Sequence, residues 1–172
     1  MKYIQIRLAI IVAAAVLIGT AAAVPARAET APDFTLESLS GDRLTLSDAL
    51  ARGPVILDFW ATWCKPCRKA LPALQGLADA HAGAVTVWTV SIDDPRSRAR
   101  IGPTLRALDV DLPALIDADK EVAALFRVTS VPATFLIAPD GTVAYEHVGY
   151  RDGDTERLAA ALSGLLARRE AP

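Results

Sequence analysis

Residues 57–67 read Leu-Asp-Phe-Trp-Ala-Thr-Trp-Cys-Lys-Pro-Cys, and they contain both cysteines of the 172-residue chain. The apolar run at residues 55–60 predicts a strand that is covered on both faces. From Cys67 onward, apolar residues recur at the three- and four-residue spacing of a helix. Two cysteines separated by two residues at a strand-to-helix turn are arranged for redox exchange.

The position of each thiol indicates its chemistry. A cysteine at a helix N-terminus meets free amide groups and the positive end of the helix dipole, which favour the thiolate. We therefore expect Cys64 to attack a partner disulfide and Cys67, one turn later, to resolve the mixed disulfide. Asp58 is the only charge in the strand, and burial would raise its pKa and fit it to accept the proton of Cys67. The alternative is a hydrogen-bonded core acid without a catalytic role.

Other uses of the cysteine pair fit the sequence less well. A disulfide that closes so short a loop stabilises a fold by about 2 kcal/mol at best in the chain-entropy model. Zinc would need two further ligands, and the two histidines, His81 and His147, lie far apart in the sequence. Covalent haem needs a histidine directly after the second cysteine, where this chain has Arg68. We therefore predict no metal and no cofactor.

The first 28 residues have the parts of a secretory signal peptide. Lys2 and Arg7 precede an uncharged apolar run at residues 8–24, and Ala-Arg-Ala follows at residues 26–28. Cleavage there would leave residues 29–172 as one domain. The alternative is a membrane anchor formed by residues 8–24, which is at the short limit for a bilayer. Both alternatives predict a periplasmic or other extracytoplasmic location, where disulfides persist.

Composition restricts the remaining classes of function. With 52% hydrophobic residues the chain can bury one ordinary core. The formal net charge is −2, and no basic run interleaves with aromatic residues, so we predict no nucleic-acid binding. Arg96, Arg98 and Arg100 lie close to Asp93 and Asp94, a pattern typical of a solvated face. Nothing in the pattern predicts an oligomer, and we expect a monomer.

The rest of the chain predicts an α/β fold. Strands are expected at residues 55–60, 85–90, 112–116, 134–137 and 142–148, and helices at 67–78, 97–108, 120–126 and near the C-terminus. Pro-Asp-Gly at residues 139–141 indicates a hairpin, and Ser47 is expected to cap a brief helix through Ala51. This order implies a mixed central sheet flanked by helices.

Residues 58–69, with Ala-Pro-Asp-Phe at residues 31–34, resemble the thioredoxin-like superfamily, and in particular its TlpA/ResA-type extracytoplasmic thiol–disulfide oxidoreductases. The resemblance extends over residues 31–166. It implies a thioredoxin-like fold with an N-terminal extension and a central insertion before the hairpin. It also matches Cys64 and Cys67 to the nucleophilic and resolving cysteines. The Val131–Pro132 bond is matched to a cis-proline loop that binds substrate together with Trp63; from the residues alone, a trans proline at the start of an edge strand stays open.

The resemblance implies exchange of disulfides with protein cysteines, by a reductase that a membrane-embedded electron donor keeps reduced. It further suggests a role in cytochrome c maturation. Several members of the group carry a glutamate three positions after the second cysteine, where this chain has Ala70, so properties that depend on that acid do not carry over. One alternative is a peroxiredoxin-like peroxide reductase, although the required threonine position is occupied by Ala61. The other is a non-enzymatic thioredoxin-like binding module.

Overall fold

The computed structural model describes residues 29–170. The predicted leader, residues 1–28, therefore lies outside the described part of the chain. Within residues 29–170, no helix has the length and the apolar character needed to cross a bilayer.

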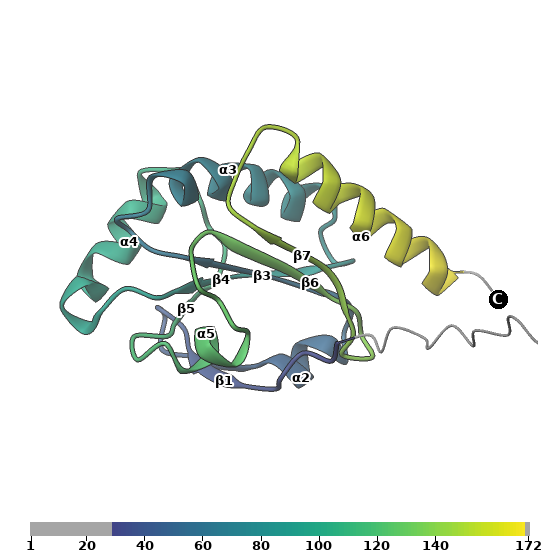
Figure 1. The fold of residues 1–172 in the computed structure, drawn as a ribbon, viewed down its shortest axis with the longest axis horizontal. Helices are drawn as coiled ribbons and strands as arrows, with labels where there is room; N and C mark the ends of the chain where they lie inside the picture. Colours follow the sequence, from purple (N-terminus) through teal and green to yellow (C-terminus); the bar gives the residue numbers. More distant parts are fainter. Residues whose placement is uncertain (1–28, 171–172) are drawn as a thin grey trace, which may run out of the picture.

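A five-stranded mixed sheet forms the centre of the fold (Figure 1). Its strands, in spatial order, are β5 (Ala114–Ile116), β4 (Thr86–Ser91), β3 (Val55–Trp60), β6 (Ala133–Ile137) and β7 (Val143–Val148). The pairs β3–β4 and β4–β5 are parallel, whereas β3–β6 and β6–β7 are antiparallel. The predicted mixed sheet is therefore confirmed, with the expected hairpin formed by β6 and β7.

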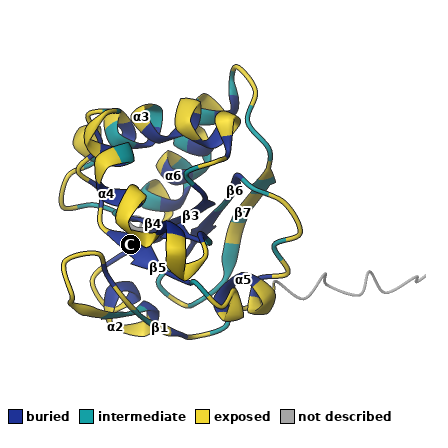
Figure 2. Ribbon diagram, turned by 90° about the vertical axis from the view of Figure 1, so that its left-hand side faces the viewer, coloured by how far each residue is buried: buried dark blue, intermediate teal, exposed yellow. Residues whose placement is uncertain are grey.

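Helices cover both faces of the sheet (Figures 1 and 2). One face carries α3 (Lys65–Ala80), α4 (Arg98–Arg106) and α6 (Asp154–Glu170), with the short helix η2 (Pro95–Ser97) before α4. The other face carries α2 (Leu46–Leu50), α5 (Glu121–Leu125) and the hairpin of β1 (Thr35–Glu37) and β2 (Arg43–Thr45). The hairpin and α2 form the predicted N-terminal extension, and the segment from η2 to α5 forms the central insertion.

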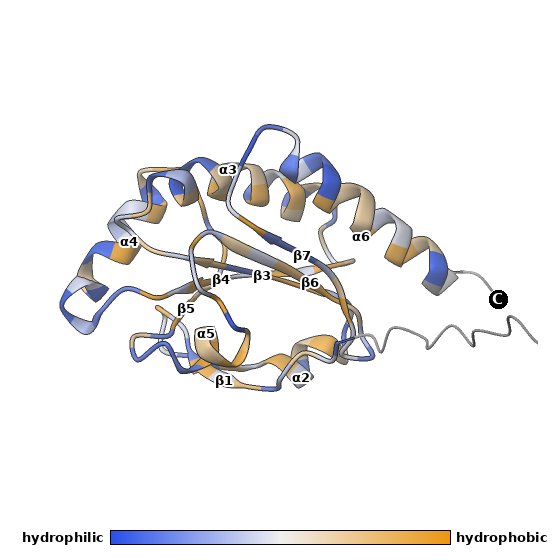
Figure 3. Ribbon diagram, viewed as in Figure 1, coloured by the Kyte–Doolittle hydropathy of each residue, from blue (hydrophilic) through white to orange (hydrophobic). Residues whose placement is uncertain are grey.

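Strand β3 lies at the centre of the sheet, and all six of its residues are buried. Ile56 and Trp60 pack in the cluster under α3, α4 and α6, whereas Leu57 and Phe59 pack in the cluster on the opposite face. On α3 and α6, the ribbon is coloured as hydrophobic mainly on the side toward the sheet (Figure 3). Because side chains alternate along a strand, Asp58 lies on the α3 side of the sheet.

Most predicted elements are present, with shifted ends. Helix α3 begins at Lys65, two residues before the apolar spacing becomes visible, and it continues through Pro72. The prediction that Ser47 caps α2 is wrong. The helix follows Thr45, which makes no side-chain cap, and the amide of Ser47 donates instead to Oδ1 of Asp33 at 2.9 Å.

Candidate active site

The turn between β3 and α3 is held by Asp93. Its carboxylate accepts hydrogen bonds from the amide of Thr62 at 2.8 Å and from the Thr62 hydroxyl at 2.7 Å. The hydroxyl of Ser91, at the end of neighbouring strand β4, donates to the same carboxylate at 2.9 Å. Asp93 is buried, and its two oxygens therefore fix the loop that presents Cys64. In the sequence Asp93 stands out only beside the arginine cluster; its position two residues after a buried strand is the signal that could have identified it.

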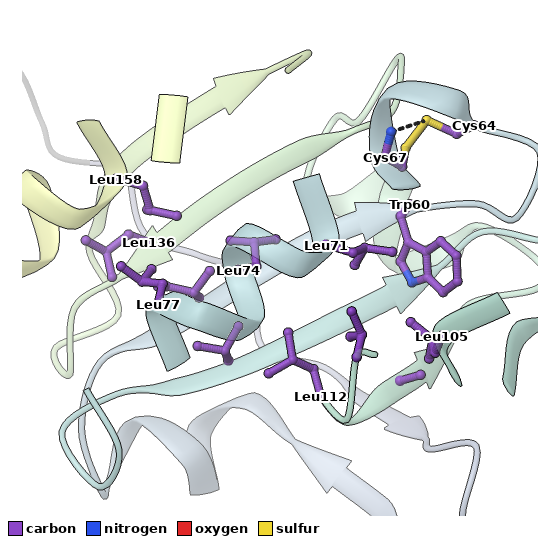
Figure 4. Close-up of a cluster of buried hydrophobic side chains, with 14 of the residues drawn as sticks. Trp60, Cys64, Cys67, Leu71, Leu74, Leu77, Leu105, Leu112, Leu136 and Leu158 are labelled. Atoms are coloured by element: carbon purple, nitrogen blue, oxygen red, sulfur yellow. Dashed lines mark hydrogen bonds between the residues drawn. A yellow bond between two sulfur atoms is a disulfide. The ribbon is translucent and has the colours of Figure 1, made fainter. Parts of the chain in front are cut away.

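The two cysteines are joined to each other as a disulfide at the start of α3 (Figure 4). Cys64 is the N-cap residue of the helix, and its Sγ accepts a hydrogen bond from the amide of Cys67 at 3.2 Å. Cys64 is 4% exposed and Cys67 is fully buried, so Cys64 is the outer sulfur of the pair. In the reduced protein, the same amide and the helix N-terminus would stabilise a thiolate on Cys64.

A second loop lies against Cys64. The Val131–Pro132 peptide bond is cis, and the carbonyl oxygen of Val131 lies 3.6 Å from Sγ of Cys64. The loop is anchored by the amide of Gly149, which donates to the Pro132 carbonyl at 2.8 Å. The cis geometry agrees with the resemblance, and the trans alternative is wrong. Trp63, next to Cys64, is 66% exposed, so an apolar surface adjoins the disulfide.

Asp58, on the α3 side of β3, is wholly buried. Oγ1 of Thr134 donates to its Oδ1 at 2.7 Å, and its Oδ2 has no hydrogen-bond partner among the described residues. Burial raises the pKa of Asp58 from 3.8 to about 7, although the hydrogen bond from Thr134 acts in the opposite direction. A carboxyl with this pKa can both accept and release a proton near neutral pH.

The structure does not place the groups of the alternative chemistries at the cysteines. A peroxide reductase would need a threonine hydroxyl at the reacting cysteine. Thr62, the threonine nearest to Cys64 in the sequence, instead donates its hydroxyl hydrogen bond to Asp93. His81 lies at the C-terminal end of α3 and His147 on β7. In residues 29–170, no group of three His, Cys, Asp or Glu side chains is arranged to hold a metal ion. The site is therefore a disulfide, a buried acid and a proline loop.

Comparison with known proteins agrees with this geometry. Residues 28–146 match the AhpC/TSA family. The chain belongs to this family. It is 37% identical over 122 residues to the thioredoxin-like protein YneN of Bacillus subtilis, covering 70% of this chain and 71% of that protein. It is 35% identical over 113 residues to the thiol–disulfide oxidoreductase ResA of the same organism, covering 66% of this chain and 62% of ResA.

A solved structure supports the same assignment. A Chlorobium tepidum protein assigned as the thiol:disulfide interchange protein DsbE has a TM-score of 0.73 and 31% identity. The similarity covers 81% of this chain and 96% of that one. The fold is therefore thioredoxin-like, and the chain is a thiol–disulfide oxidoreductase of the ResA/DsbE type with Cys64 and Cys67 as its CxxC pair. These relatives favour the enzyme over the non-enzymatic binding module.

Proposed function

We propose that the protein reduces disulfides of other proteins outside the cytoplasm, with Cys64 as the nucleophile and Cys67 as the resolving thiol. The observation that carries this proposal is the position of Cys64 at the N-cap of α3, with its sulfur beside the Val131 carbonyl and less buried than that of Cys67.

The exchange proceeds in two steps. The Cys64 thiolate attacks one sulfur of the substrate disulfide and forms a mixed disulfide, while the other substrate sulfur leaves as a thiolate. The Cys67 thiolate then attacks Sγ of Cys64 and releases the second substrate sulfur. Two electrons pass to the substrate, and the enzyme is left with the Cys64–Cys67 disulfide that the structure contains.

The second step requires Cys67 to lose its proton, and we assign that proton to Asp58. Cys67 packs in the cluster on the α3 side of the sheet, and Asp58 lies on that same side of β3. With a pKa of about 7, the Asp58 carboxyl can accept and release a proton near neutral pH. A general base in this position accelerates a proton transfer by about 10² to 10⁴.

The substrate-binding surface in this proposal consists of Trp63, Val131 and Pro132. An extended substrate segment can pair with the backbone of Val131 while its sulfur faces Cys64. The exposed ring of Trp63 offers large apolar contact area beside the reacting sulfur. The surface thus suits a polypeptide substrate rather than a small molecule.

The setting of the reaction rests on the sequence of the leader. Residues 1–28 have the pattern of a signal peptide, which would deliver residues 29–172 as one soluble extracytoplasmic domain, or alternatively of an anchor at residues 8–24. In that compartment the oxidised pair must be reduced again, and we infer a membrane-embedded electron donor. We also propose that the protein acts in cytochrome c maturation and that it is a monomer.

Reduction of insulin by dithiothreitol tests the proposal. Wild-type protein should accelerate insulin precipitation over dithiothreitol alone, whereas Cys64→Ser and Cys67→Ser should show the background rate. Acceleration by Cys64→Ser equal to that of the wild type would refute the assigned nucleophile. Hydrogen peroxide consumption by the same reduced samples tests the peroxide-reductase alternative, which predicts rapid turnover at micromolar peroxide.

A further inference from the structure

Three polar side chains lie in a row across the sheet from the buried acid to its edge. Asp58 on β3 is the register partner of Thr134 on β6, and Thr134 is the register partner of His147 on β7. Directly opposite residues of antiparallel strands point to the same face and have neighbouring Cβ atoms. The row therefore lies on the α3 side of the sheet and reaches from the central strand to the outermost one (Figure 1).

The outer end of the row is polar and partly exposed. Nε2 of His147 is itself buried and lies 3.0 Å from Oδ2 of Asp154 without forming a hydrogen bond among the described residues. The His147 side chain is 27% exposed, whereas that of Asp154 is 5% exposed. Asp154 is itself held by the Arg151 amide and the Arg157 guanidinium. His147 thus stands between solvent and the buried part of the row.

A small cavity joins the middle of the row to its outer end. Thr134, His147 and Asp154 line it together with Ala70 and Leu74 of α3. The volume within which the centre of a water molecule can move is about 20 Å³, enough for one or two waters. Helix α3 contributes only these apolar side chains to the lining, so the polar groups of the cavity come from the sheet, the loop after β7 and the start of α6.

Asp58 needs a route for its proton. A proton that it accepts from Cys67 either returns to that thiol when the pair is reduced again or leaves for solvent, and the carboxyl itself is wholly buried. Its hydrogen bond within residues 29–170 leads to Thr134, which borders the cavity. A hydroxyl can accept a proton on one lone pair and release its own proton elsewhere.

We propose that Thr134 and His147 relay the proton of Asp58 to solvent through water in this cavity, an inference that rests on the proposed role of Asp58. The Cys67 thiol gives its proton to the Asp58 carboxylate and becomes the attacking thiolate. The carboxylic acid passes the proton to the Thr134 hydroxyl, whose own proton moves through cavity water to the imidazole of His147. The resulting imidazolium is stabilised by Asp154 and releases the proton to solvent, so that every proton is accounted for.

Histidine suits the outer position because it is the side chain that ordinarily changes charge between pH 5 and 8. The titratable and charged groups around His147 come from every element that meets it. They are Tyr145 on β7, Tyr150 in the following loop, Asp154 and Arg157 on α6, and Asp58 on β3 through Thr134. Asp154 is the carboxylate in direct contact, so the charged imidazole has a counter-ion in place.

The test compares insulin reduction between pH 5.5 and 8.5 for His147→Ala, Thr134→Val and Asp58→Asn. Tyr145→Phe is the matched control, because it removes from the same cavity and strand face a hydroxyl that the relay does not use, and it keeps the ring beside His147. We expect about a tenfold loss at pH 7 for His147→Ala and Thr134→Val and wild-type rates for Tyr145→Phe. Added imidazole should restore His147→Ala but not Asp58→Asn, an effect that a purely structural role of His147 would not produce.

The outcomes separate the relay from the function beneath it. If Asp58→Asn is slow while His147→Ala keeps the wild-type rate and pH profile, the relay is wrong and the role of Asp58 stands. If His147→Ala is slow but does not respond to imidazole, the relay is also wrong. If Asp58→Asn turns over like the wild type, both the relay and the acid's role fail, whereas loss of activity in Cys64→Ser would still support the disulfide exchange.

Discussion

Oγ1 of Thr134 lies 2.7 Å from Oδ1 of Asp58, and this is the one hydrogen bond that the carboxyl receives within residues 29–170. Burial and this bond act on the carboxyl in opposite directions, and together they leave its pKa at about 7. The hydroxyl thus limits how far burial can raise the pKa. A threonine on a different strand tunes the acid beneath the cysteines.

Replacing Thr134 by valine should raise the pKa of Asp58 above 7, because the bond that favours the ionised form is lost while the burial is kept. Carbon-13 NMR titration of the labelled aspartate carboxyls measures this directly, with Asp58→Asn used to assign the resonance. A pKa for Asp58 that is unchanged or lower in Thr134→Val would contradict the assignment of Thr134 as the tuning group.

The buried acid should also make stability depend on pH. In the unfolded chain Asp58 ionises near pH 4, whereas in the folded protein it keeps its proton to about pH 7. The folded state binds the extra proton, so the free energy of unfolding falls as pH rises from 4 to 7, by about 4 kcal/mol at most. Asp58→Asn should lack this fall. Urea unfolding of the oxidised wild type and Asp58→Asn at pH 4.5 and pH 8 measures this fall. The same change in unfolding free energy in both proteins would count against the raised pKa.

Asp93 should be required for a rigid active-site turn. Asp93→Ala leaves the Thr62 amide, the Thr62 hydroxyl and the Ser91 hydroxyl without their acceptor. Loss of its acceptor costs a buried donor about 1–3 kcal/mol; one of these three bonds is buried and two are part-buried, so we expect about 3 kcal/mol of lost stability. Thermal unfolding measures the loss. The neighbouring Asp94→Ala is the control, since it removes only an exposed cap of η2 and should cost about 1 kcal/mol. Equal losses would show that Asp93 has no special role.

Trp63 should matter for protein substrates and not for small ones. Trp63→Ala removes a large exposed apolar surface next to Cys64, and we expect the rate of insulin reduction to fall about tenfold. Reduction of a small aromatic disulfide reagent should be unchanged, because that molecule needs only the sulfur. Leu125→Ala is the control, since Leu125 is 54% exposed on α5, at the opposite face of the sheet. If Trp63→Ala slows the reduction of insulin and of the small reagent alike, Trp63 affects the reactivity of Cys64 rather than substrate binding, and the prediction is wrong.

The sequence predicted the parts of the site that lie within one continuous segment. An apolar run broken only by Asp58, followed by two cysteines and a helical pattern, sufficed for the buried strand, the turn and the outer and inner sulfur. The mixed sheet followed from the order of the elements. The cis bond at Pro132 required the resemblance, because the residues themselves allow a trans proline as well.

The parts that the sequence did not predict depend on contacts between distant segments. Thr134 and His147 reach Asp58 through the registers of β3 with β6 and of β6 with β7, and the second register shifts between Leu136 and Ile137. No local pattern fixes such a register. The wrong prediction of a Ser47 cap has the same cause: Asp33, fourteen residues earlier, accepts a hydrogen bond from the Ser47 amide.

The most direct test of the central claim is a trapping experiment with insulin at pH 7. The reduced Cys67→Ala variant should form a covalent adduct through Cys64 that survives on a non-reducing gel and disappears with dithiothreitol, because no second thiol remains to release the partner. The reduced Cys64→Ala variant should form no adduct, because its remaining cysteine, Cys67, is fully buried. An adduct through Cys67, or no adduct through Cys64, would contradict the account.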